Sequence, residues 1–168
     1  AKSIGNVSVD EGKSISIDPL GNLYTTGSFV GTVDFDPGLG INNLTSVGAA
    51  DVFILKLDAA GDFVWAKSFG GTLPESGNSI AIDPSGYIYS TGIFRGTVDF
   101  DPSAGTDIHT SVGEDDVYIQ KLDTSGNFLW TKCIGGIDFE DGYAISADAS
   151  GNVYMIGNFY DTVDFDPG

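Results

Sequence analysis

The residues best suited to chemistry are pairs of aspartates that return at a fixed spacing. Each pair stands in the string Val-Asp-Phe-Asp-Pro, and the pairs are Asp34 with Asp36, Asp99 with Asp101, and Asp164 with Asp166. In an extended segment, residues two apart point to the same side, so each pair presents two carboxylates together and turns its phenylalanine toward the core. Two carboxylates with backbone carbonyls nearby could begin a Ca²⁺ site.

Three interpretations of these aspartates are open. Calcium takes about six to eight oxygen ligands, so further ligands such as Asp51 or Asp116 would be required, and the spacing does not match an EF-hand loop. The favoured interpretation is that the carboxylates accept hydrogen bonds from backbone N–H groups at turns and strand ends. Paired-carboxylate catalysis is disfavoured, because the motif recurs in every copy whereas an active site is normally built once. We therefore predict no catalytic and no cofactor-binding residue, and Ca²⁺ is the only cofactor under consideration.

The aspartate pairs belong to a tandem repeat of the whole chain. An interval of 65 residues separates Asp18 from Asp83 and Asp83 from Asp148, and the same interval separates the three VDFDP strings. A period of this size indicates a repeat architecture in which each unit needs its neighbours. Hydrophobic residues and turn residues recur at the same interval as the aspartates, so the repeat is a structural unit.

Strand and turn signals within one repeat predict four short strands. In the second copy we expect strands at 79–82, from 87, at 117–122 and at 128–132, with hairpin turns at 83–86 and 123–126. Asp opens each of these turns and Gly ends it, which suits a tight turn that needs a positive φ.

The third strand of the repeat is apolar on both of its faces. Its first copy reads Val52-Phe53-Ile54-Leu55, and a sheet with one face in solvent would alternate apolar and polar residues instead. The fold class predicted is therefore all-β: a β-propeller of four-stranded antiparallel blades. The chain, 1–168, is one propeller segment with blades at about 5–69 and 70–134 and a partial blade at 135–168.

The repeat resembles a known family. The segments SIAID-PSG-YIYSTG and DVYIQKLDTSGNFLWTK, followed by a Gly-Gly pair, are similar to the SBBP repeat, the seven-bladed β-propeller repeat of bacterial exported proteins. The part that spans the first two strands also resembles NHL and YVTN blades. The resemblance implies an exported, extracellular or cell-surface bacterial protein. It implies no single activity and supplies no catalytic residue, since a fold does not settle a function.

The repeat is longer than a typical blade of about 40–50 residues. The surplus lies between the second and third strands, at about 30–50 and 95–115, and we expect long loops there. Up-and-down connectivity puts these loops at the same end of the blade as the acids Glu75 and Glu140 in the connections between blades. We therefore predict one acidic long-loop face that meets any cation or partner.

Charge limits the partners of the chain. It has 24 acidic and 7 basic residues and a formal net charge of −17, which disfavours binding to nucleic acid or to anionic membranes. No apolar run approaches the roughly 20 residues that would insert into a bilayer. The partners expected are further blades of the same chain or copies of itself, and a protein or glycan on the acidic face.

The sequence predicts a non-enzymatic extracellular or cell-surface module that acts as a scaffold, adhesin or binding domain. One alternative is a calcium-binding or calcium-stabilised propeller module. A second is a fragment of a larger exported enzyme whose active site lies outside this chain. Because propellers close with four or more blades, we expect a longer chain, or else a ring assembled from several copies.

Overall fold

The computed structural model describes residues 2–165, and their regular structure is entirely β-strand. The strands are β1 (Glu11–Ile17), β2 (Leu23–Asp34), β3 (Asn43–Leu57), β4 (Phe63–Phe69), β5 (Ser76–Ile82), β6 (Ile88–Asp99), β7 (Ile108–Leu122), β8 (Phe128–Ile134), β9 (Asp141–Ala147) and β10 (Val153–Asn158). They form antiparallel sheets in the orders β1-β2-β3-β4, β5-β6-β7-β8 and β10-β9. Within this part of the chain, no helix has the length and hydropathy that crossing a bilayer requires.

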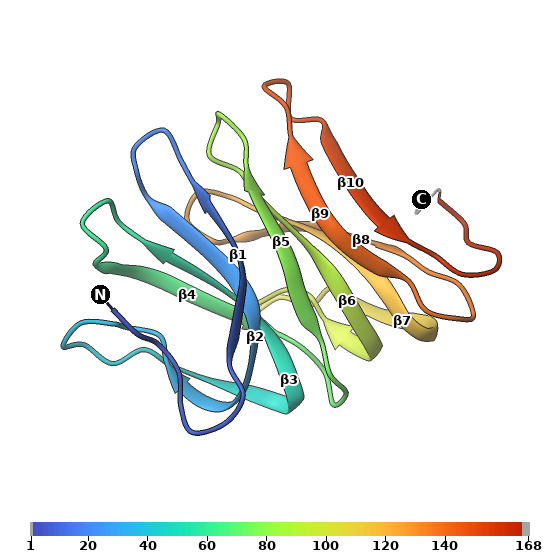
Figure 1. Cartoon of the computed structure of the whole chain (residues 1–168), viewed down its shortest axis with the longest axis horizontal. Coiled ribbons are helices and arrows are strands. Elements are labelled where there is room, and N and C mark those ends of the chain that lie inside the picture. Colours follow the sequence, from blue (N-terminus) through green and yellow to red (C-terminus); the bar gives the residue numbers. More distant parts are fainter. Residues whose placement is uncertain (1, 166–168) are drawn as a thin grey trace.

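The three sheets stack face to face, with their first strands side by side (Figure 1). Two hydrogen bonds between first strands repeat from one junction to the next. The N–H of Ile80 donates to Oγ of Ser14 at 3.3 Å, and the N–H of Ile145 donates to Oγ of Ser79 at 3.2 Å. Four-stranded blades stacked in this way confirm the predicted propeller architecture, and the described sheets form a partial propeller rather than a closed ring.

The strand β3 is buried on both faces, as its sequence predicts. Val52 and Ile54 pack into the core between the first and second sheets, and Phe53 and Leu55 pack into a separate core on the opposite face. Full burial of each such side chain contributes roughly 1.5–3 kcal/mol. A blade therefore gains much of its stability from the sheets on either side of it.

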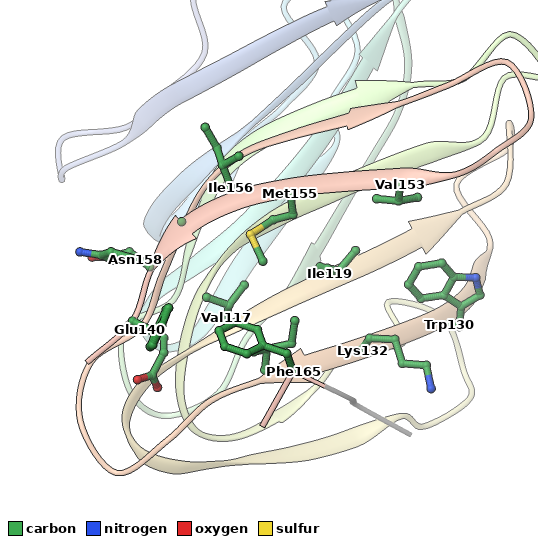
Figure 2. Close-up of a pocket in the computed structure, with 14 residues that line it drawn as sticks. Val117, Ile119, Trp130, Lys132, Glu140, Val153, Met155, Ile156, Asn158 and Phe165 are labelled. Atoms are coloured by element: carbon green, nitrogen blue, oxygen red, sulfur yellow. The ribbon is translucent and has the colours of Figure 1, made fainter. Parts of the chain in front are cut away.

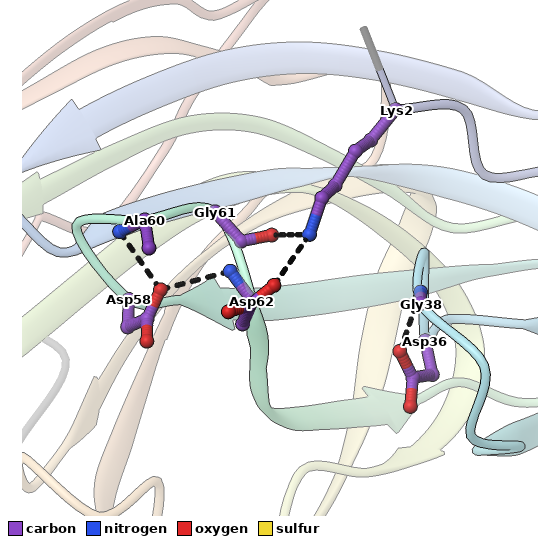
Figure 3. A network of polar contacts seen from close by, with 7 residues as sticks. All are labelled: Lys2, Asp36, Gly38, Asp58, Ala60, Gly61 and Asp62. Carbon is purple, nitrogen blue, oxygen red and sulfur yellow. Dashed lines mark hydrogen bonds and ion pairs between the residues drawn. The ribbon is translucent and has the colours of Figure 1, made fainter.

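The tight turns are built as the sequence predicts. In the turn at 83–86, Oδ1 of Asp83 accepts hydrogen bonds from the N–H groups of Ser85 (2.8 Å) and Tyr87 (3.0 Å), while Gly86 has a φ of +86°. Figure 3 shows the same arrangement in the first blade, where Oδ1 of Asp58 accepts from Ala60 and Asp62. These aspartates therefore have a structural role in fixing each hairpin.

The long loops expected at 30–50 and 95–115 are not loops. β2 continues to Asp34 and β3 begins at Asn43, so the surplus residues extend the hairpin and leave only 35–42 outside the strands. Thr32 and Thr45 face each other across this extension with their hydroxyl oxygens 2.9 Å apart. Threonine and valine suit paired strands, which explains why the segment folds as sheet. The second copy does the same between β6 and β7.

In the first two copies the phenylalanine of the VDFDP motif points into the core, as predicted, and in the third copy it does not. Phe35 and Phe100 are fully buried. Phe100 packs edge-on against Phe94, with ring centroids 5.1 Å apart, and also contacts Phe69 of the preceding blade. Phe165, at the same repeat position, is 56% exposed and touches Phe159.

An apolar pocket of about 520 Å³ lies between the second sheet and β10 (Figure 2). Val117 and Ile119 of β7 line one side, and Val153 and Met155 of β10 line the other. β10 occupies the repeat position of β6, which pairs with β7. No described strand pairs with the corresponding edge of β10, so the pocket lies where a strand equivalent to β7 would complete the third sheet.

Because Phe100 is buried and Phe165 is exposed, replacing each by alanine should lower the free energy of unfolding by different amounts. Phe100→Ala should lower the free energy of unfolding by about 3–5 kcal/mol, because it leaves a cavity in the core between two blades. Phe165→Ala, the matched control at the exposed repeat position, should cost much less. Urea denaturation followed by tryptophan fluorescence measures both, and equal costs would contradict the packing described above.

The turn aspartates predict an acid dependence of stability. Partial burial raises the pKa of Asp123, but the hydrogen bonds from Asn127 and Ser125 outweigh it, so the pKa lies below its ordinary value of 3.8. A lowered pKa stabilises the folded state above that value, and this contribution is lost as the pH falls through the folded-state pKa.

Asp123→Ala should therefore lower the free energy of unfolding by about 1 kcal/mol at neutral pH. The difference from wild type should shrink when denaturation is repeated at an acid pH at which the wild-type carboxylate is protonated. Asp62→Asn is the control, since the equivalent residue of the next copy is Asn127. A cost that is the same at both pH values would rule out a charged cap.

Candidate functional site

The aspartates of the VDFDP motif accept backbone hydrogen bonds. Oδ1 of Asp34 accepts from the N–H of Asp36 at 3.0 Å and from that of Asn42 at 2.8 Å, closing the end of the β2–β3 hairpin. Oδ1 of Asp36 accepts from the N–H of Gly38 at 2.7 Å (Figure 3). These contacts match the favoured structural interpretation of the motif.

The second copy of the motif repeats this geometry. Oδ1 of Asp99 accepts from the N–H groups of Asp101 (3.1 Å) and Asp107 (2.8 Å), and Oδ1 of Asp101 accepts from that of Ser103. In the third copy Asp164 follows β10, and Asp166 lies outside the described residues. Among residues 2–165, no group of three or more His, Cys, Asp or Glu side chains is arranged to hold a metal. Calcium binding by these six aspartates stays a prediction.

Two other acids meet at the junction between the first and second blades. Asp51 lies in β3 and Glu75 in the connection from β4 to β5, and each is only 1% exposed. Oδ2 of Asp51 accepts from the N–H of Val47 at 3.0 Å, and Oε2 of Glu75 accepts from that of Gly71 at 2.9 Å. The second oxygens, Oδ1 of Asp51 and Oε1 of Glu75, are buried and accept no hydrogen bond. Such groups are rare because burying an unpaired carboxylate is costly.

The next junction contains the same pair. Asp116 and Glu140 are 2% and 1% exposed, and their Oδ2 and Oε2 atoms accept from the N–H groups of Val112 (3.0 Å) and Gly136 (2.7 Å). Oδ1 of Asp116 and Oε1 of Glu140 are again buried without a hydrogen bond. The sequence analysis considered Asp51 and Asp116 only as additional ligands of the VDFDP motif. It missed their pairing with Glu75 and Glu140, because the partners belong to different blades.

Burial has electrostatic consequences at these pairs. Desolvation raises the pKa of Glu75 to about 8, and the neighbouring charge of Asp51 adds to the effect despite the hydrogen bond from Gly71. Desolvation likewise raises the pKa of Asp51 and of Asp116, and the charge of Glu140 contributes to the rise at Asp116. None of the ion pairs among the described residues includes any of these four acids. Any negative charge on these four carboxylates therefore has no basic side chain at ion-pair distance to balance it.

A second group of residues that the sequence analysis missed lies in the first strand of each blade. β1, β5 and β9 each contain a β-bulge at the same repeat position, and the bulged residues are Lys13, Asn78 and Tyr143. The flanking glycines and the following isoleucines are identical in all copies, whereas the bulged residue differs in each. Bulges redirect a side chain without changing the rest of the strand and are frequent beside functional sites.

The bulges are linked by hydrogen bonds across three blades. Nζ of Lys13 donates to Oγ of Ser76 at 2.8 Å and to Oδ1 of Asn78 at 3.3 Å. Nδ2 of Asn78 in turn donates to the carbonyl oxygen of Gly142 at 3.0 Å. We call Glu11, Lys13, Ser76, Asn78, Asp141 and Tyr143 the bulge row. The signal that could have found the row is disagreement between aligned copies, read together with the glycines that accompany it.

The bulge row lies toward one end of the sheets, which we call the acidic end. The acidic end consists of the β2–β3 and β6–β7 hairpin tips and the β4–β5 and β8–β9 connections. Gly70 pairs with Asp99, and the N–H of Glu75 donates to the carbonyl oxygen of Ala50 at 2.7 Å, so hairpins and connections meet there. Most of the acidic residues lie at this end. Its Arg95 is already bound to Glu114 and Asp115, at 3.0 and 2.8 Å.

Comparison with known proteins agrees with this architecture. Residues 4–28 match the family model SBBP, described as a beta-propeller repeat. The chain is 24% identical over 186 aligned residues to an uncharacterized WD repeat-containing protein, L264, of Acanthamoeba polyphaga mimivirus. That alignment covers 95% of this chain and 13% of the relative.

It is also 28% identical over 117 residues to the regulatory protein FlaEY of Caulobacter vibrioides, an alignment that covers 70% of this chain and 12% of the relative. The chain thus spans about an eighth of the length of these relatives. The match of residues 4–28 to a beta-propeller repeat agrees with the stacked four-stranded sheets, which have the architecture of propeller blades.

Proposed function

We propose that the chain is a non-enzymatic protein-binding scaffold whose acidic end, centred on the bulge row, docks basic segments of partner proteins. The observation that carries this proposal is the contrast within the repeat. The turn aspartates, the VDFDP motif and core residues such as Phe94, whose counterpart is Phe29, return unchanged and are occupied by hydrogen bonds or packing. The bulge row changes from copy to copy at positions where the backbone tolerates change.

Charge supports a basic partner. The chain carries a formal charge of −17, and an acidic surface steers cationic partners toward it and repels nucleic acid. The names of the relatives, a WD repeat-containing protein and a regulatory protein, are compatible with a binding role. An activity located elsewhere in a larger protein is the alternative, and it would leave the bulge row without a ligand.

We propose further repeats as structural partners of the chain, supplied by the same polypeptide or by a copy. The support is the apolar pocket beside β10, together with the pairing of β7 to β6, the strand at the repeat position of β10. An extracellular or cell-surface location, and an adhesive role there, are proposed from the resemblance to exported propellers. Antibody labelling of intact cells tests the location, and staining that requires permeabilised cells would argue against it.

If the bulge row docks basic segments, removing negative charge from it should weaken peptide binding, and adding negative charge should strengthen it. Glu11→Gln combined with Asp141→Asn should weaken binding of a labelled Lys/Gly peptide about threefold, and Lys13→Glu should strengthen it by a similar factor. Binding should also weaken as ionic strength rises from about 0.05 to about 0.5 M. Fluorescence anisotropy measures all of these.

Asp62→Asn is the matched control, because it removes one exposed carboxylate from the opposite end of the sheets. It should leave peptide affinity unchanged. If the affinity of every variant, Asp62→Asn included, changed only in proportion to net charge, the bulge row would not be the docking site. If they all bound as the wild type does, the proposed function would fail.

A further inference from the structure

Each junction between neighbouring blades holds two carboxylates with an unused, buried oxygen. At the first junction these are Oδ1 of Asp51 and Oε1 of Glu75, and at the second Oδ1 of Asp116 and Oε1 of Glu140. The other oxygen of every carboxylate is fixed by a backbone N–H. The hydrogen bond to one oxygen of each carboxylate therefore also fixes the position of its free oxygen. Carboxylates that bind a metal are usually held by hydrogen bonds in this way.

A glycine lies directly against each pair. An added Cβ at Gly70 would lie 2.6 Å from Oδ1 of Asp51 and 2.7 Å from Oε2 of Glu75, so both carboxylates pack against the same residue. A Cβ at Gly135 would collide with the carboxylate of Asp116, and a Cβ at Gly136 would lie 3.4 Å from Oε1 of Glu140. Both pairs are therefore held close to the glycines of the connection between blades.

We propose that each junction binds one hard divalent cation of the Ca²⁺ class, between Asp51 and Glu75 and again between Asp116 and Glu140. The donor set consists of oxygens, which favours Ca²⁺ or Mg²⁺ over metals that prefer nitrogen or sulfur. A cation balances both charges of a pair, whereas a single shared proton leaves one buried carboxylate ionised. The ion joins a strand of one blade to the connection that starts the next, and so fixes the angle between blades.

This site is distinct from the VDFDP motif and does not depend on the proposed function. The carboxylates of Asp36 and Asp101 sit in the turns after β2 and β6, each bonded to a backbone N–H two residues further on. These turns therefore provide a matched comparison in the same molecule. Replacing the glutamates by glutamine keeps their shape and removes their charge.

The test is calcium titration of the whole chain by isothermal calorimetry, with thermal unfolding in calcium or in chelator. At about 1 mM Ca²⁺ the wild type should bind one ion per junction and melt at least about 4 °C higher than in chelator. Glu75→Gln and Glu140→Gln should each lose one junction's ion, and the double variant should lose both ions and the shift. Asp36→Asn with Asp101→Asn should bind as the wild type does.

Three results would overturn the proposal. One is the absence of any calcium heat and of any shift in the wild type. Another is calcium binding that survives in the glutamine variants and disappears in the Asp36 and Asp101 variant, which would place the ion at the VDFDP turns. The third is a stability that changes with pH identically in calcium and in chelator, which would show that protons alone neutralise the pairs. If the double glutamine variant does not fold, the two single variants give the same discrimination.

Discussion

The structure depends on burial of the long strands β3 and β7 from both sides. Because Val52 and Ile54 pack on one face and Phe53 and Leu55 on the other, both faces of the blade need an apolar cover. This requirement explains the features that surround it. The turns are short and rigid, the hairpin phenylalanines close the edge of each core, and the first strands lie side by side along the stack. Stability in such a stack is a sum over neighbouring blades.

Several parts of this arrangement could be predicted from sequence because they are local. An aspartate and a glycine three residues apart specify a turn whatever the rest of the chain does, and Asp83 with Gly86 forms it. Apolar residues on both faces of β3 likewise indicate, from the sequence alone, that both faces of the strand are buried. The prediction of long loops at 30–50 and 95–115 was wrong because the valine and threonine residues in these segments favour paired strands.

Other parts could not be predicted, because they arise only when separate blades come together. Asp51 and Glu75 are unremarkable in the sequence, and their contact depends on where the connection from β4 to β5 crosses the junction. The bulge row is similarly hidden, since a bulge at Lys13 or Asn78 changes no hydrophobic pattern. Both groups of residues are brought together by packing between repeats, and the sequence of a single repeat does not indicate that packing.

The bulge of the first strand also bears on how such a protein can change over generations. The glycine beside each bulge, such as Gly27, which pairs with Gly12, lets two backbones approach so closely that a side chain there would collide with the carbonyl oxygen of Glu11. The register of the blade is thereby fixed by glycine and leaves the bulged position unconstrained. Each duplication of a blade therefore adds one more bulged residue that can be substituted without disturbing the sheet. Tandem duplication followed by single substitutions is then enough to diversify what the array recognises.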